Sequence, residues 1–431
     1  METMSETCTV VHFSREPSLA RIETIKANEV PGKIAENNHS FGTFYVCCIV
    51  LSILTYLTDL GLTITLLYFY SHQGYPLHFA LTLTFVLLPA ICMSTVSLRW
   101  YIIDHDDPSV GKASLSHWLI RILFLLLQIS PLLRYIETLI YGIRSKVAGK
   151  TEYDSQQTFL YRRMLDEDTN SSLLRLFHCF LHCAPQAVMQ LVFLLIFVMY
   201  PERTSTTSLD ISVIQAWTVF ISIISIAWSL TTYHRSVRFA RDDKDKIKWI
   251  GLLVAFCWQL MSALSRILAL SLLAAILPTW MGVICALHWG VMSIWLAIGQ
   301  HQTASCSSRC EELLLSVALG LAYVLAFISP RDGPTRYVYL AYYLVCFMEN
   351  TGALVVWCVT NNSSSNPFLY YGAAGSQVVS FVLAMVFLII YYKYCHPSLS
   401  KRSKIPTVRS DYIENDKPCY SKTSYNFRTS S

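Results

Sequence analysis

One stretch of the sequence decides the fold class: residues 211–248, ISVIQAWTVFISIISIAWSLTTYHRSVRFARDDKDKIK. Residues 211–233 carry no charged side chain and exceed the roughly 20 apolar residues that cross a bilayer as a helix. Residues 234–248 then gather six Arg and Lys residues. Because basic loops beside a span stay in the cytoplasm, this stretch predicts a membrane helix and the side on which it ends.

Similar apolar segments recur along the chain. Nine more lie near residues 43–70, 77–103, 118–140, 171–199, 248–270, 271–300, 312–329, 335–360 and 368–394. Hydrophobic residues make up 54% of the chain and charged residues only 14%, which predicts an all-α polytopic membrane protein. We expect a helical membrane domain over residues 43–395. The polar, aperiodic residues 1–42 and 396–431 are predicted to be flexible cytoplasmic tails.

The positions of the basic stretches show that ten complete crossings conflict with the charge pattern. Besides 234–248, Lys and Arg collect in both tails and in residues 141–170. Three apolar segments separate the N-terminal tail from 141–170, and five separate 234–248 from the C-terminal tail, so basic stretches would fall on both faces. Eight transmembrane helices plus two re-entrant hydrophobic helices remove the conflict and leave both termini cytoplasmic. We assign 77–103 and 271–300 as the two segments that enter and leave by the same face.

Ionisable residues inside the apolar segments are candidates for function, because a charge at the bilayer centre costs about 2.5–3.5 kcal/mol. The candidates are Asp59, Arg175, His178, His182, Arg266 and Glu349. Two interpretations stay open. Buried carboxylates pair with buried arginines to lock the bundle, with Asp59 or Glu349 neutralising Arg266 or Arg175, or the residues line a polar path for a zwitterionic group.

The segment LLRLFHCFLHCAPQAVMQL, residues 173–191, carries two histidines and two cysteines. His178 and His182 are four residues apart, as are Cys179 and Cys183, so each pair shares one helix face. The two pairs point about 100° apart, and no second cluster of ligands has a matching spacing, so we predict no metal site. Pro185 is expected to kink the helix and to free a carbonyl near His182.

Several other classes are excluded by the absence of their motifs. The sequence contains no nucleophile triad, Walker loop, dinucleotide fingerprint or HExxH motif, so we predict no enzymatic activity and no cofactor. The net charge of +5 sits in short loops beside spans, where it sets orientation and favours anionic lipid. No nucleic-acid partner is therefore expected.

The residues resemble the XK-related family of polytopic membrane proteins over most of residues 50–397. The matching segments are Asp59-Leu60-Gly61, FVLLPAICMSTVSLRW (85–100), LLLQISPLLRYIETLIYG (125–142), residues 173–191, RILAL (266–270), Glu349-Asn350 and YYKYCHP (391–397). Some members of this family are phospholipid scramblases that are activated in apoptosis. The resemblance implies eight spanning helices with two helices that only dip into the bilayer, and a hydrophilic route of charged side chains, to which Asp59, Arg175, Arg266 and Glu349 correspond.

This chain departs from the family pattern at three positions. Thr63 stands where the resemblance implies a second aspartate, and His178 and His182 stand where it implies glutamates. Fewer carboxylates would attract choline or amine headgroups more weakly, and the route would depend on histidine protonation.

The resemblance also implies regulation and partners. The family includes members controlled by caspase cleavage of a tail and members that associate with a single-pass membrane protein. In this chain Ile413-Glu414-Asn415-Asp416 resembles a caspase recognition sequence in an exposed tail, which makes Asp416 the candidate cleavage site.

Two hypotheses of function follow. The first is a plasma-membrane phospholipid scramblase that passively exposes phosphatidylserine during apoptosis, with phospholipids as its partners and a caspase as its activator. The second is a subunit without transport activity that stabilises or positions a partner membrane protein.

Overall fold

The computed structural model describes residues 41–106, 114–127, 129–149, 154–199, 209–240, 247–299, 309–328, 336–360 and 367–396. Every regular element in these ranges is helical. Residues 1–40 and 397–431, which make up most of the two tails predicted from the sequence, lie outside the described ranges. The candidate cleavage site at Asp416 lies outside them as well.

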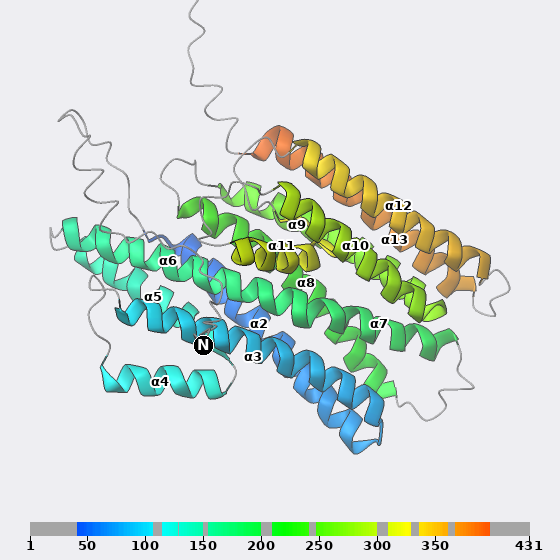
Figure 1. The fold of residues 1–431 in the computed structure, drawn as a ribbon, viewed down its shortest axis with the longest axis horizontal. Helices are drawn as coiled ribbons and strands as arrows, with labels where there is room; N and C mark the ends of the chain where they lie inside the picture. Colours follow the sequence, from blue (N-terminus) through cyan, green and yellow to red (C-terminus); the bar gives the residue numbers. More distant parts are fainter. Residues whose placement is uncertain are drawn as a thin grey trace, which may run out of the picture.

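Among the described residues, eight long apolar helices have the length and composition of a membrane span, which confirms the predicted number. They are α2 (Thr43–His72), α3 (Pro76–Asp106), the continuous helix of α6 (Asp154–His178), η1 (Cys179–Cys183) and α7 (Ala184–Met199), α8 (Leu209–Phe239), α9 (Trp249–Ile276), α10 (Pro278–Gly299), α12 (Arg336–Thr360) and α13 (Pro367–Ile390), which η2 (Tyr391–Cys395) extends. Figure 1 shows these helices running side by side across the molecule.

The choice of the two non-crossing segments was wrong. The segments 77–103 and 271–300 contain α3 and α10, and both helices are long enough to cross. The segment 118–140 is instead broken into α4 (Leu115–Leu126) and α5 (Ser130–Ala148), and 312–329 contains only the short α11 (Arg309–Tyr323). The break before α5 has a local cause, because Pro131 occupies its first turn and starts a new helix.

The corrected assignment satisfies the charge pattern. With α4–α5 and α11 set aside, two spans separate the N-terminal tail from residues 141–170, two separate 141–170 from 234–248, and four separate 234–248 from the C-terminal tail. Every interval is even, so all four basic stretches share one face. That two hydrophobic helices turn back within the bilayer stays a prediction, and its candidates are now α4–α5 and α11 instead of 77–103 and 271–300.

The most buried spans, α8 and α9, form the centre of the bundle. Within their apolar windows 61% of residues are buried, compared with 17% in α10 and in α13, whose outer apolar side chains are left to contact lipid. Helix α8 packs against α2, α6, α7 and α9, while α9 also contacts α10, α12 and α13 (Figure 1). Two groups of helices therefore meet at the α8–α9 contact.

The predicted disturbance at Pro185 takes the form of a widened turn. Residues Cys179–Cys183 form the π-helical turn η1, in which the backbone N–H of Ala184 donates to the carbonyl of Cys179. A π-helical turn inserts one extra residue into the helix and is frequent at functional sites. It changes the direction in which His178, His182 and Cys183 project.

Candidate functional site

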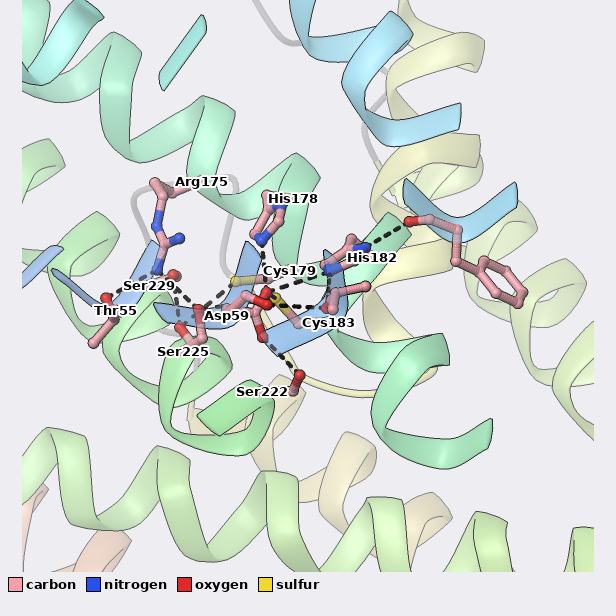
Figure 2. Close-up of polar contacts among 12 residues, drawn as sticks. Thr55, Asp59, Arg175, His178, Cys179, His182, Cys183, Ser222, Ser225 and Ser229 are labelled. Atoms are coloured by element: carbon pink, nitrogen blue, oxygen red, sulfur yellow. Dashed lines mark hydrogen bonds and ion pairs between the residues drawn. The ribbon is translucent and has the colours of Figure 1, made fainter. Parts of the chain in front are cut away.

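Asp59 is the centre of a buried polar cluster between α2, η1 and α8. Its Oδ2 lies 3.0 Å from Nε2 of His178 and 3.4 Å from Nε2 of His182, and it accepts a hydrogen bond of 3.3 Å from Sγ of Cys183. Its Oδ1 accepts a 2.7 Å hydrogen bond from the hydroxyl of Ser222. All five side chains are buried, and Figure 2 shows them converging on Asp59. We call these five residues the Asp59 cluster.

The two histidines are held in defined positions. Their rings stack with centroids 4.7 Å apart, and the ring of His178 also packs edge-on against Tyr56. Nδ1 of His182 lies 2.6 Å from the carbonyl oxygen of Phe85 in α3. Nε2 of His182 faces Asp59 and lies 3.5 Å from the hydroxyl of Thr63, so the three positions that depart from the family pattern lie together.

Arg175 lies beside this cluster but contacts hydroxyls instead of a carboxylate. Its Nη2 donates to Thr55 Oγ1 at 3.2 Å and to Ser225 Oγ at 2.9 Å, and its guanidinium lies 5.3 Å from the centre of the Tyr56 ring (Figure 2). The side chain is fully buried, and Nε and Nη1 have no hydrogen-bond partner among the described residues. A buried cation without a direct counter-charge is expensive in the membrane.

Ser222 and Ser225 belong to a polar stripe along the whole of α8. The stripe consists of Ser212, Gln215, Thr218, Ser222, Ser225, Ser229, Thr232 and Ser236, which are spaced three or four residues apart and are all buried. That spacing places them on one helix face. From Ser212 to Ser236 the stripe rises about 36 Å at 1.5 Å per residue, which exceeds the roughly 30 Å thickness of the hydrocarbon.

The neighbouring helices add polar groups along the stripe. Towards one end, Gln215 donates to the hydroxyl of Tyr70 in α2, which in turn donates to Gln190 in α7. Towards the other end, the hydroxyls of Ser236 and Ser172 in α6 lie 2.6 Å apart. The interface of α2, α6–α7 and α8 is therefore polar from end to end, and we call it the polar seam.

A second charged cluster joins α9, α10 and α12. Arg266 forms a close ion pair with Glu349, and its other hydrogen bonds go to Asn350 at 3.1 Å and to the carbonyl of Val324 at 2.8 Å. Nδ1 of His288 lies 2.8 Å from the second oxygen of Glu349. We call Arg266, Glu349, His288 and Asn350 the Arg266 cluster. It connects three spans to the end of α11.

A third network links α5 to α3 and α6. Arg134 forms a buried ion pair with Glu167 at 2.7 Å. Burial disfavours its charged form, but the charge of Glu167 dominates and holds the pKa of Arg134 above its usual value. Burial and the nearby charge of Glu167 raise the pKa of Glu137 in α5 to about 7. The Arg134–Glu167 pair ties α5 to α6, and the contact of Arg121 with Glu137 at 3.6 Å ties α4 to α5.

The structure brings the sequence-predicted residues together in two separate groups. Asp59 meets His178 and His182, whereas the predicted pairing of Glu349 with Arg266 is confirmed. Asp59 pairs with histidines instead of an arginine, because the guanidinium of Arg175 donates to hydroxyls such as that of Ser225. Whether these residues contact lipid stays a prediction.

Sequence reasoning missed the polar seam and one metal-compatible arrangement. From Thr218 to Ser236 the stripe residues of α8 alternate at spacings of four and three, which was a readable signal of a polar helix face. The ligand atoms of Asp59, His178 and Cys183 lie within 4.8 Å of one another. Spacing within one segment did not reveal this group, because its carboxylate comes from another helix and the π-helical turn redirects Cys183.

Fold and site define a polytopic helical membrane protein with buried charges between its spans. Residues 47–397 match the family described as XK-related protein, and the chain belongs to this family. It is 26% identical over 357 residues to Cell death abnormality protein 8 of Caenorhabditis elegans, covering 80% of this chain and 76% of that protein. It is 25% identical over 377 residues to the protein of the same name from Caenorhabditis briggsae, covering 85% and 79%.

Proposed function

We propose that this protein is a passive phospholipid scramblase of the plasma membrane, in which headgroups move along the polar seam while acyl chains stay in the lipid. The observation that carries the proposal is the continuous polar stripe of α8, which exceeds the hydrocarbon thickness. Membership of the XK-related family supports the proposal, because residues 47–397 match that family and the similarity covers 76% of the Caenorhabditis elegans protein.

The chemistry of the seam suits a zwitterionic headgroup. Asp59 offers a negative group to an amine or choline, and Arg175 offers a positive group to a phosphate. Both are surrounded by the hydroxyls of Ser222 and Ser225, which donate and accept hydrogen bonds. In the described state these side chains contact one another, so headgroup passage requires α2 and α8 to separate and exchange these contacts for lipid.

The biological setting is inferred from the relatives. Both of the similar Caenorhabditis proteins carry the name cell death abnormality protein, which supports a role in cell death. We infer that the lipid exposed is phosphatidylserine, and that a caspase cut after Asp416 in the cytoplasmic C-terminal tail starts the activity.

Reconstitution tests this function directly. Liposomes with fluorescent lipid in both leaflets receive the full-length protein or a chain that ends at Asp416, and dithionite then bleaches the accessible lipid. We expect bleaching beyond the outer-leaflet half in liposomes with the shortened chain, and little with the full-length chain. Protein-free liposomes and a full-length Asp416→Ala chain treated with caspase are the controls.

The Arg266 cluster favours a second candidate, a non-transporting subunit that positions a single-pass partner protein. Its ion pair, its histidine and its contact with Val324 form a closed cross-brace, as a structural role requires. Equal and negligible bleaching with both chains would favour this second function and remove the first.

A further inference from the structure

We propose that Asp59, His178 and Cys183 form a binding site for a zinc ion, with His182 as the nearest fourth ligand. The inference goes beyond lipid movement, and its test measures metal and not lipid. It departs from the expectation drawn from the sequence, which considered ligands of one helix only.

The donor atoms and their separations fit zinc. Oxygen, nitrogen and sulfur are its usual ligands, at about 2.0–2.3 Å, so tetrahedral ligands lie about 3.4–3.6 Å from each other. Oδ2 of Asp59 lies 3.0 Å from Nε2 of His178 and 3.3 Å from Sγ of Cys183. An expansion of a few tenths of an ångström on these two edges opens the position for the ion, and all three ligand atoms lie within 4.8 Å of one another.

The hydrogen bonds of His182 leave the lone pair of its Nε2 facing Asp59, where a cation or a proton would bind. A carbonyl oxygen only accepts, so Nδ1 of His182 carries the proton that it donates to Phe85. The hydroxyl of Thr63 donates its single proton to the backbone carbonyl of Asp59, at 2.9 Å. Nε2 of a neutral His182 therefore directs its lone pair at the carboxylate oxygen 3.4 Å away, and only a proton or a cation makes this contact favourable.

The groups around these ligands hold them as metal ligands are held. Zinc-bound histidines usually donate their second N–H to a carbonyl or carboxylate, as His182 does to Phe85. The hydroxyl of Ser222 fixes the other oxygen of Asp59 at 2.7 Å. Arg175 stays outside the set, because it contacts Thr55 and Ser225.

Zinc binding releases one proton, which the thiol of Cys183 loses to solvent as it binds as the thiolate. A neutral His178 releases none, because it takes the tautomer with its proton on Nδ1 and binds the metal through the Nε2 lone pair that faces Asp59. The thiolate and the Asp59 carboxylate together supply two negative charges that offset the two positive charges of the ion. Burial of the ligands, all at most 3% exposed, excludes water from the site.

The test uses the full-length protein purified in detergent without chelators. We expect one zinc ion per chain by mass spectrometry of the metal content. After zinc removal, Co²⁺ is expected to produce the thiolate charge-transfer absorption of a cobalt–cysteine bond. Cys183→Ser should abolish that absorption and lower Zn²⁺ affinity at least about 100-fold, since even partners that only orient a ligand contribute 10- to 100-fold. Ser222→Ala should lower it about tenfold.

Cys179→Ser is the matched control, because Cys179 lies in the same π-helical turn and is equally buried, but donates to the carbonyl of Ser225. This variant should bind Co²⁺ as the wild type does. Absence of bound metal in the wild type, or a charge-transfer absorption that survives in Cys183→Ser or disappears in Cys179→Ser, would overturn the proposal.

A measurement on the wild type covers the case in which Cys183→Ser does not fold. A small membrane-permeable alkylating reagent is applied with and without Zn²⁺, and the modified cysteines are identified by mass spectrometry. We expect Zn²⁺ to slow alkylation of Cys183 and to leave Cys179 unchanged. Equal rates with and without Zn²⁺ at Cys183 would show that the cluster is an ion pair only.

Discussion

The Asp59 cluster and the Arg266 cluster each hold a buried charged side chain among the spans, but its charge is neutralised in different ways. In the Arg266 cluster, the positive charge of Arg266 meets the negative charge of Glu349 directly. In the Asp59 cluster, Asp59 meets two histidines and a thiol, and the nearby Arg175 contacts hydroxyls. One buried charge is neutralised by a permanent ion, and the other depends on a proton or a metal.

This difference separates a structural role from a functional one. A permanent ion pair between α9 and α12 holds the spans in one arrangement whatever the conditions. The partners of Asp59 can be exchanged for those of a headgroup, because each is a neutral or titratable hydrogen-bonding group. The contrast predicts that the Arg266 cluster controls stability and that the Asp59 cluster controls activity.

The largest effect is expected from breaking the Arg266 cluster. Arg266→Ala leaves Glu349 without its partner and should lower the free energy of unfolding by about 3–5 kcal/mol, as for other broken buried pairs. Chemical denaturation in detergent micelles measures this loss. The double variant Arg266→Met/Glu349→Gln should recover a large part of it. A loss below about 1 kcal/mol in Arg266→Ala would mean that the pair does not brace the bundle.

The next largest effect on stability is expected at Glu137, which lies outside the eight candidate spans and makes the stability depend on pH. Its pKa is raised from 4.5 to about 7 in the folded protein, so its contribution to stability is complete below pH 4.5 and is lost as the pH rises to 7. Glu137→Gln should therefore stabilise the protein at pH 8, by up to about 3 kcal/mol at 1.36 kcal/mol per pKa unit. At pH 4 the two proteins should unfold at the same denaturant concentration, and a constant difference across this range would contradict the assignment.

Asp59 is expected to affect activity more than stability. Asp59→Asn keeps the shape of the side chain but removes the charge, and hydrogen bonds to charged groups contribute about 1.5–3 kcal/mol. We expect lipid movement by the chain ending at Asp416 to slow at least about tenfold in the dithionite assay, at similar expression. A normal rate in a folded Asp59→Asn protein would exclude this carboxylate from the lipid route.

The smallest effect compares two adjacent threonines of α8. Thr232 belongs to the polar stripe, whereas Thr231 faces another side of the helix, and both are buried. Each donates to a backbone carbonyl of its own helix, Thr231 to Ala227 and Thr232 to Trp228, so both Thr→Val changes should have a similar, small effect on stability. Only Thr232→Val should slow scrambling, about twofold to threefold, because a hydrogen bond across a membrane-helix interface contributes about 0.6 kcal/mol. Equal scrambling rates in the two variants would exclude the end of the stripe around Thr232 from the lipid route.

The number of spans could be predicted from the sequence, because loop charges and apolar length act over whole segments. The non-crossing segments were chosen wrongly, although the sequence carries signals for them. The segment 118–140 contains three charged residues and Pro131, whereas 77–103 contains one charged residue. The segment 312–329, which contains α11, has 18 residues and is the shortest of the ten apolar segments.

The site was predictable residue by residue but not in its pairing. Burial of Asp59 and Arg266 followed from the cost of charges in the bilayer. Their partners depend on how helices distant in sequence are placed, which fixed Arg266 beside Glu349 and Asp59 beside His178. The π-helical turn at Cys179–Cys183 adds a rotation that helical spacing does not contain.

The central claim, that headgroups move along the polar seam, is tested most directly by removing the middle of the stripe. The variant Thr218→Val/Ser222→Ala/Ser225→Ala/Ser229→Ala, in the chain ending at Asp416, is compared with Thr231→Val in the dithionite assay. We predict that the fourfold variant loses lipid movement while it still elutes as a folded protein, and that Thr231→Val retains the parent rate. A fourfold variant that moves lipid at the parent rate would contradict the account.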